Sequence, residues 1–133
     1  MPLFCPVVVV GHSECGGAAA CLNALQRPSI SVDEPISTIP SLSPDAPLNR
    51  WLDPLTKHLR SLQLSDMPRE VALPIVVQEN VKRQVEHVCK TQPMIDAWSN
   101  VDPERRNVWV HGWVYDLASG RLRDLEISRG PAE

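Results

Sequence analysis

The sequence predicts an α/β domain built on a partial parallel sheet, and three features of the chain support this fold class. The run Val7–Val10 is apolar and β-branched without polar alternation, which is typical of a strand buried on both faces. Helical patterns of apolar residues follow it, and a strand–turn–strand pattern comes after them. We expect parallel strands at about residues 6–10 and 107–115, an antiparallel last strand at about 121–127, and covering helices.

Length and composition limit the classes of protein to consider. The 133 residues suit one domain, and the net charge of −3 disfavours a nucleic-acid-binding protein, which needs a basic surface. No apolar run approaches the roughly 20 residues needed to cross a bilayer. Pro6–Val10 has no cationic residue before it and does not resemble a secretory signal. Four cysteines without such a signal suggest a reducing compartment, and we expect a cytoplasmic protein.

The first half of the chain predicts two helices separated by a connector. Small residues favour a helix over Ala18–Leu25, and the composition of Pro28–Pro47 predicts an extended surface connector, ordered in places by Ile30, Ile36 and Ile39. An amphipathic helix follows, marked by apolar residues at helical spacing: Leu48, Trp51, Leu52, Leu55, Leu59 and Leu62. Pro54 either kinks this helix or stands in the first turn of a second helix capped by Asp53.

The second half predicts two more helices and a hairpin. Valines at helical spacing (Val77, Val81, Val85 and Val88) indicate a helix that Pro74 opens and that ends near Thr91. A short helix is expected over Pro93–Trp98. In the strand Asn107–Tyr115 we expect the valines on one face and the aromatic residues Trp109, Trp113 and Tyr115 on the other. Asp116–Gly120 is then the turn to the last strand.

The loop Gly11-His12-Ser13-Glu14-Cys15-Gly16-Gly17 carries the chemistry. It leaves the carboxyl end of the first strand, where open α/β sheets place their ligand sites. Cys15 stands where a helix begins, and the helix dipole there favours the thiolate. An imidazole and a thiolate are zinc ligands, so His12 and Cys15 are candidate ligands. The alternatives are a turn histidine and a cysteine that is either inert or reactive; Ser13 fits a turn hydrogen-bonder better than a nucleophile.

Three segments of the sequence resemble the β-class carbonic anhydrases. The apolar strand running into Gly11–Gly17 is similar to that family's second zinc motif. Glu79-Asn80-Val81 with Gln84-Val85 is similar to the helix after the connector. Val110-His111-Gly112-Trp113-Val114-Tyr115-Asp116, followed by Gly120-Arg121-Leu122, resembles the closing hairpin. The resemblance runs from about Val7 to Leu125 and implies the C-terminal part of the β-carbonic anhydrase fold.

The resemblance implies reversible, zinc-dependent hydration of CO₂ to bicarbonate. In that family two Cys and one His hold Zn²⁺, which lowers the pKa of its bound water to about 7, so that zinc hydroxide is the nucleophile. His12 and Cys15 match two ligands, and the Gly16 N–H matches a position that donates to bicarbonate. No side chain is implied as catalytic beyond the zinc-bound water.

The sequence departs from the family in its first half. The family's Cys-x-Asp-x-Arg motif, which supplies the other Cys ligand, does not occur in the chain. Cys5 begins the same strand, about 20 Å from its far end at roughly 3.3 Å per residue, and Cys21, Cys89 and His111 are expected elsewhere. We therefore expect residues 1–133 to form a single carbonic anhydrase-like domain that is truncated at its N-terminus, where an organellar signal could also be missing.

Rival functions follow from this departure. An apolar first strand with an open edge invites pairing, so the chain could be an inactive relative that forms a homo-oligomer, or a hetero-oligomer with a full-length relative. Carbonyl sulfide or carbon disulfide could replace CO₂ as substrate, and Cys15 could instead serve as a redox or acyl-transfer nucleophile. Cys5, Cys21 and Cys89 are expected to be small core residues, and His111 to pack between strand neighbours.

Overall fold

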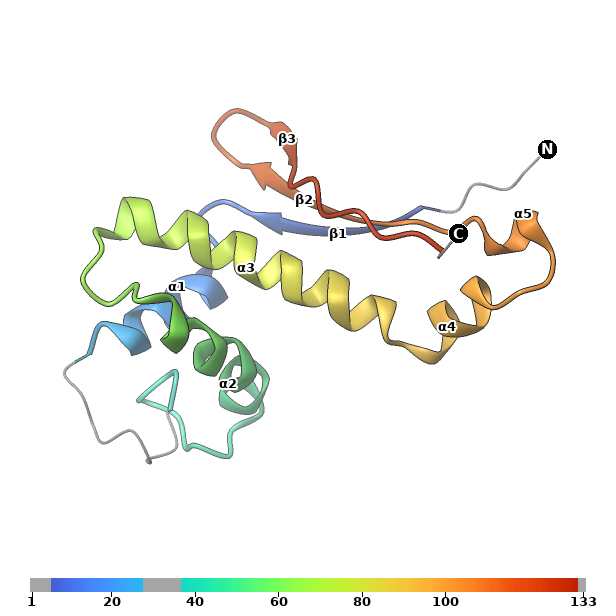
Figure 1. Cartoon of the computed structure of the whole chain (residues 1–133). Coiled ribbons are helices and arrows are strands. Elements are labelled where there is room, and N and C mark those ends of the chain that lie inside the picture. Colours follow the sequence, from blue (N-terminus) through green and yellow to red (C-terminus); the bar gives the residue numbers. More distant parts are fainter. Residues whose placement is uncertain (1–5, 28–36, 132–133) are drawn as a thin grey trace. The chain divides into compact units, whose positions relative to one another are not determined.

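The structure of the chain is a computed structural model, which describes residues 6–27 and 37–131. These residues belong to two compact units (Figure 1). One unit, here called the sheet unit, comprises Met1–Ser13 and Gln78–Glu133. The other, the helical unit, comprises Glu14–Val77. Each unit is described by itself.

The sheet unit contains a three-stranded mixed sheet in the order β1-β2-β3. β1 (Val7–His12) and β2 (Val110–Asp116) are parallel, in a register that pairs Val7 with Val110. β3 (Arg121–Asp124) is antiparallel to β2. The predicted α/β fold class is thus confirmed, with the strand directions as expected.

The ends of the strands differ from the sequence-based boundaries by a few residues. β1 continues to His12, because its register with β2 extends as far as Tyr115. β3 ends at Asp124 rather than near residue 127, and Glu126 then takes a left-handed φ of 58° that interrupts regular pairing. Beyond this break the chain still follows β2, through an isolated antiparallel bridge between Val110 and Arg129.

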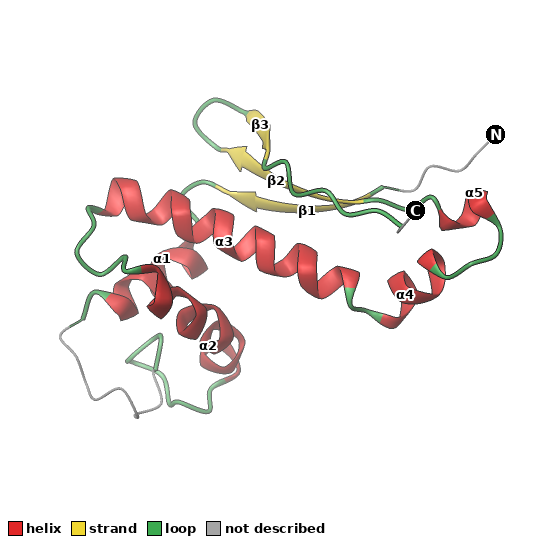
Figure 2. Ribbon diagram, viewed as in Figure 1, coloured by secondary structure: helices red, strands yellow, loops and turns green. Residues whose placement is uncertain are grey.

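Helix α3 spans Arg69–Cys89, and its part from Gln78 onward, which belongs to the sheet unit, covers one face of the sheet (Figure 2). Val110 and Val114 of β2 are buried on this covered face. Gly112 lies between them, and a Cβ there would stand 2.6 Å from Cδ1 of Ile127 and 3.1 Å from Cγ1 of Val81. The absence of a side chain at Gly112 therefore lets the helix approach the strand.

The opposite face of the sheet carries large side chains that remain exposed to solvent. By the alternation of strand residues, β2 presents Trp113 and Tyr115 on this side, and Trp109, the residue before β2, continues the same alternation, as the sequence predicts. Val10 of β1 and Leu122 of β3 pair with Trp113 and Tyr115 in the same register. We call this surface the open face and define it by its exposed members, Val10, Trp109, Tyr115 and Leu122.

Two prolines lie inside helices. α3 begins at Arg69, so the prediction that Pro74 opens it is wrong. Pro54 lies within α2 (Pro47–Leu59), a single helix, so the alternative of a second helix capped by Asp53 is also wrong. A proline inside a helix removes one backbone hydrogen bond. The burial of apolar residues along both helices, among them Leu52, Leu55, Leu59, Leu73, Val76 and Val81, offsets that loss.

Two short helices connect α3 to the sheet. α4 (Gln92–Trp98) begins one residue earlier than expected, and α5 (Pro103–Arg106) was not expected. Asp102 caps α5 by accepting a hydrogen bond from the Glu104 N–H at 3.0 Å. This Asp-Pro start is a local signal that a pattern of apolar spacing does not detect.

The helical unit packs α1 (Gly16–Leu25) against α2, which continues into the 3₁₀ helix η1 (Arg60–Leu62). Asn49, only 1% exposed, hydrogen-bonds through its amide to the segment Ser37–Ser43. The predicted connector is thus ordered from Ser37 onward, whereas its part 28–36, with Ile30 and Ile36, lies outside the described residues. Within the described ranges no helix is long and apolar enough to cross a membrane.

Candidate functional site

His12 is the last residue of β1 and is exposed at the carboxyl end of the parallel pair β1–β2. Its Nδ1 lies 2.9 Å from the carbonyl oxygen of Ser13. A carbonyl oxygen only accepts hydrogen bonds, so this contact requires the proton on Nδ1 and leaves the lone pair of the neutral ring on Nε2. Metal-binding histidines commonly use this arrangement, with one ring nitrogen donating to a carbonyl and the other facing the metal.

Cys15 and Gly16 form the start of α1 in the helical unit. Cys15 is the residue before the helix, in an extended conformation, and no side chain caps the helix there. Gly16 is exposed, and a Cβ built on it would meet nothing within 4 Å. The first turn of the helix is therefore not capped by the Cys15 side chain, and uncapped N–H groups at a helix start are the general arrangement for binding an anion.

Glu14, between the predicted ligands, adopts a left-handed backbone conformation with φ of 55°. Its carboxylate lies 3.4 Å from a guanidinium nitrogen of Arg69, and both side chains are at least half exposed. An exposed ion pair of this kind contributes little to stability. Glu14 thus marks the sharp turn between β1 and α1 and is exposed.

Ser13 is a turn hydrogen-bonder, as predicted, and its partner is a residue that sequence reasoning did not single out. Its hydroxyl contacts the Asp116 carboxylate at 3.5 Å and accepts from the Leu117 N–H at 2.9 Å. Hydrogen bonds to its carboxylate hold the pKa of Asp116 below its usual range. The bond from the Ser119 hydroxyl lowers the pKa most, and the bond from the Ala118 N–H comes next. The sequence around Asp116 is typical of a turn and does not indicate a contact with Ser13, which lies 103 positions away.

The remaining cysteines and His111 were expected to lie away from the zinc-motif loop. Cys21 is fully buried, and burial raises the pKa of its thiol; burial also raises the pKa of Cys89. His111 hydrogen-bonds through Nδ1 to the Ser128 hydroxyl at 2.7 Å and stacks near Trp113. Cys5 lies outside the described residues. Burial of Cys21 and the strand position of His111 agree with the sequence-based expectations.

The donors present do not by themselves make up a zinc site. An imidazole and a thiol are suitable ligand types, but zinc sites use three or four protein ligands. Among residues 6–27 and 37–131, no three or more His, Cys, Asp or Glu side chains gather so that they could hold a metal ion. His12 belongs to the sheet unit and Cys15 to the helical unit, so each is described only within its own unit.

Comparison with known proteins decides the family. A sequence profile described as carbonic anhydrase matches residues 5–122, which is most of the chain and includes the loop Gly11–Gly17. The chain belongs to the β-carbonic anhydrase family. The resemblance drawn from the zinc-motif loop and the hairpin is therefore confirmed.

Solved β-carbonic anhydrases share the fold of this family member. A tetrameric enzyme of Sordaria macrospora is 21% identical with a TM-score of 0.65, covering 94% of this chain and 54% of that one. The Coccomyxa enzyme, solved with acetazolamide, is 24% identical with a TM-score of 0.65, covering 90% and 46%. CafA of Aspergillus fumigatus is 27% identical with a TM-score of 0.60, covering 96% and 50%. The chain thus spans about half the length of these relatives.

Proposed function

We propose that this family member takes part in zinc-dependent, reversible hydration of CO₂ to bicarbonate and a proton. The match of the carbonic anhydrase profile to residues 5–122 carries the proposal, because that span includes the loop with His12 and Cys15. In this proposal His12 and Cys15 are two of the zinc ligands. The remaining ligand comes from outside the described residues, since these hold no group of three candidate donors.

The side chains around the loop support separate parts of this proposal. The Nδ1–H of His12 donates to a backbone carbonyl, which leaves Nε2 for a metal ion. The open N-terminal turn of α1 suits bicarbonate, to which the Gly16 N–H donates. We also propose residues 1–133 as a single functional domain of this family, in which both units contribute to the activity.

Zinc content and CO₂ hydration test the first proposal together. The purified chain should contain zinc by elemental analysis and should accelerate CO₂ hydration in stopped flow. His12→Ala and Cys15→Ser should each lower the zinc content at least about 10-fold, the scale at which even supporting contacts of a metal site act. His87→Ala and Cys89→Ser, which change the same residue types elsewhere, should leave it unchanged. Zinc-free, inactive protein would overturn the proposal for this chain.

A second candidate function is association through the sheet unit, without catalysis. Among the described strands β1 pairs only with β2, and its four consecutive valines contain no charge or proline that would block a further strand. The open face adds apolar side chains, with Val10 50%, Trp109 43%, Tyr115 37% and Leu122 55% exposed. In this proposal the partner is a second copy or a full-length relative, and the chain is inactive.

Sedimentation velocity tests the second candidate, and the zinc and activity measurements above then show whether catalysis accompanies association. Association predicts a weight-average mass that rises with protein concentration, or a complex with a full-length β-carbonic anhydrase when the two are mixed. A protein of 14.8 kDa that stays monomeric at every concentration and does not bind the relative would exclude this candidate. An active, zinc-loaded oligomer would instead support catalysis and assembly together.

A further inference from the structure

The turn after β1 is bonded directly to the turn after β2. The Ser13 N–H donates to the carbonyl oxygen of Tyr115 at 2.9 Å. The Ser13 hydroxyl accepts from the Leu117 N–H at 2.9 Å and donates to Oδ1 of Asp116 at 3.5 Å. All of these residues belong to the sheet unit, and Ser13 is partly buried. Ser13 is therefore held through both its backbone and its side chain.

Asp116 is itself fixed by its own turn. Oδ1 accepts from the Ala118 N–H at 2.9 Å, and Oδ2 accepts from the Ser119 hydroxyl at 2.7 Å. Its carbonyl oxygen accepts from the N–H of Gly120, whose φ of 69° closes the turn. Charge-assisted hydrogen bonds of this kind are stronger than neutral ones. The carboxylate that Ser13 meets is thus already oriented.

The Ser13 carbonyl group connects these contacts to the imidazole of His12. The Ser13 carbonyl oxygen accepts the Nδ1–H of His12 at 2.9 Å. That carbonyl is attached to the Cα of Ser13, and the neighbouring turn holds Ser13 on either side of this atom through its N–H and its hydroxyl. Loss of the Ser13 or Asp116 side-chain contacts would free the Ser13 backbone to rotate, and the imidazole would lose its acceptor.

We propose that Ser13 and Asp116 are positioning residues that hold the His12 imidazole in the Nδ1–H tautomer and so present Nε2 to a ligand. The inference deepens the proposed function, since it concerns the same predicted ligand. It assigns roles to two residues that are not among the predicted zinc ligands. A purely structural role, in which Asp116 only closes the β2–β3 turn, predicts a loss of stability without a change of the His12 tautomer.

Imidazole NMR of the full chain tests this directly, without metal. Two-bond ¹H–¹⁵N spectra at about pH 8.5, well above the usual histidine pKa of about 6.5, report the tautomer of each neutral ring. His12 should be mainly Nδ1–H. In Ser13→Ala and Asp116→Ala the ratio of Nδ1–H to Nε2–H should fall by about 2- to 10-fold, the shift that loss of one hydrogen bond produces. Ser13→Thr keeps the hydroxyl and should restore the ratio.

Ser128→Ala is the matched control, because Ser128 bonds a different histidine, His111. It should alter the His111 signals and leave His12 unchanged. An Nε2–H tautomer for His12 in the unmodified chain would overturn the proposal, as would a ratio that neither Ser13→Ala nor Asp116→Ala changes. If the alanine variants do not fold, Asp116→Asn decides the matter: it keeps an oxygen acceptor but loses the charge, and an unchanged ratio would contradict the role of the carboxylate.

The tautomer and the proposed activity can fail independently. A chain that holds His12 as Nδ1–H but binds no zinc would refute the proposed function and leave the positioning role standing. A zinc-loaded, active chain whose apo form holds His12 as Nε2–H would do the reverse.

Discussion

The two faces of the sheet differ in how completely they are packed. On the covered face Val110 is fully buried, and Gly112 lies directly beneath side chains of α3 and the C-terminal segment. On the open face Val10, Trp109, Tyr115 and Leu122 are each more than a third exposed. The same strand, β2, contributes alternate residues to both faces, so the difference lies in what covers them.

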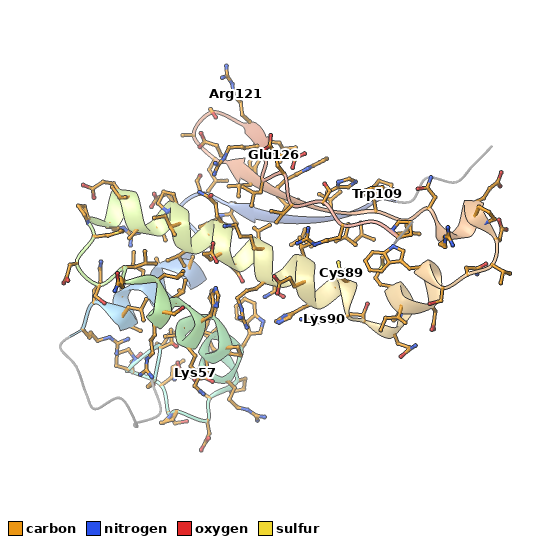
Figure 3. The ribbon with its side chains drawn as sticks, viewed as in Figure 1. Lys57, Cys89, Lys90, Trp109, Arg121 and Glu126 are labelled. Atoms are coloured by element: carbon orange, nitrogen blue, oxygen red, sulfur yellow. The ribbon has the colours of Figure 1, made fainter. Side chains whose placement is uncertain are left out.

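This difference assigns two roles within the sheet unit: the covered face stabilises the fold, and the open face is available for association. Residues on the covered face stabilise the fold because they have exchanged water for close-packed neighbours. The apolar side chains on the open face are still in contact with water, so their burial against a partner would be favourable. Exposed apolar patches of a few hundred Å² often mark interaction sites. Figure 3 labels Trp109 beside the C-terminal segment and Arg121 at the hairpin tip, pointing away from the sheet. Substitutions can therefore separate the two roles.

The largest expected effect is loss of packing on the covered face. Val110→Ala removes two methyl groups from a fully buried site and should lower the free energy of unfolding by about 2–3 kcal/mol. The matched change Val10→Ala, at a position 50% exposed on the open face, should cost less than about 1 kcal/mol. Urea denaturation measures both. Equal losses would mean that the open face is covered in solution.

A second pair of substitutions compares steric freedom on the two faces. A Cβ at Gly112 would meet Ile127 at 2.6 Å, and a Cβ at Gly130 would meet the Trp109 ring at 2.7 Å. Gly112→Ala should cost about 1–3 kcal/mol, since Val81 behind it is buried. Gly130→Ala should cost less, because the exposed Trp109 ring can swing away. Adding Ile127→Val to Gly112→Ala should recover part of the loss in thermal denaturation, and no recovery would argue against this clash.

The third prediction concerns association through the open face. If a partner covers it, Trp109→Ser should weaken self-association by about 5- to 30-fold, the usual range for a central aromatic residue. Trp51→Ser is the matched control, because Trp51 is 73% exposed but lies in the helical unit. Sedimentation equilibrium gives both association constants. A larger effect at Trp51 would place the interface in the helical unit instead.

Most of the fold could be predicted from local patterns. The run Val7–Val10 predicted the parallel strand β1 correctly, but its burial on both faces was wrong, because none of these valines is buried and Val10 is 50% exposed. The alternation along β2 assigned its two faces correctly. The helix starts were less predictable, because prolines inside α2 and α3 are tolerated where the apolar face is buried, and burial is a tertiary property. Asp102 before Pro103 was a usable signal for α5 that apolar spacing alone does not contain.

The candidate site could be predicted only in part. The loop from His12 to Gly16 was identified from its residues and from its resemblance to a zinc motif, and the family is confirmed. The ligand roles of His12 and Cys15 stay a prediction. The contact of Ser13 with Asp116 could not be foreseen, because 103 residues separate them and only the parallel register of β1 with β2 brings their turns together.

The smallest expected effect lies at the exposed end of the sheet, in the pH dependence of the Asp116 turn. Hydrogen bonds hold the pKa of Asp116 below its ordinary value of 3.8, so the folded state favours the carboxylate. The stabilisation is then fully present above about pH 4 and is lost as the pH falls through the lowered pKa. Amide hydrogen exchange should show declining protection of the Ala118 N–H, which donates to this carboxylate, while the Val110 N–H keeps its protection on the covered side. Asp116→Asn should remove the pH dependence at Ala118. Protection at Ala118 that stays constant in the unmodified chain down to about pH 2.5 would show that the carboxylate does not stabilise this turn. The turn would then be ordered by its backbone hydrogen bonds, such as that from the Gly120 N–H to the Asp116 carbonyl oxygen.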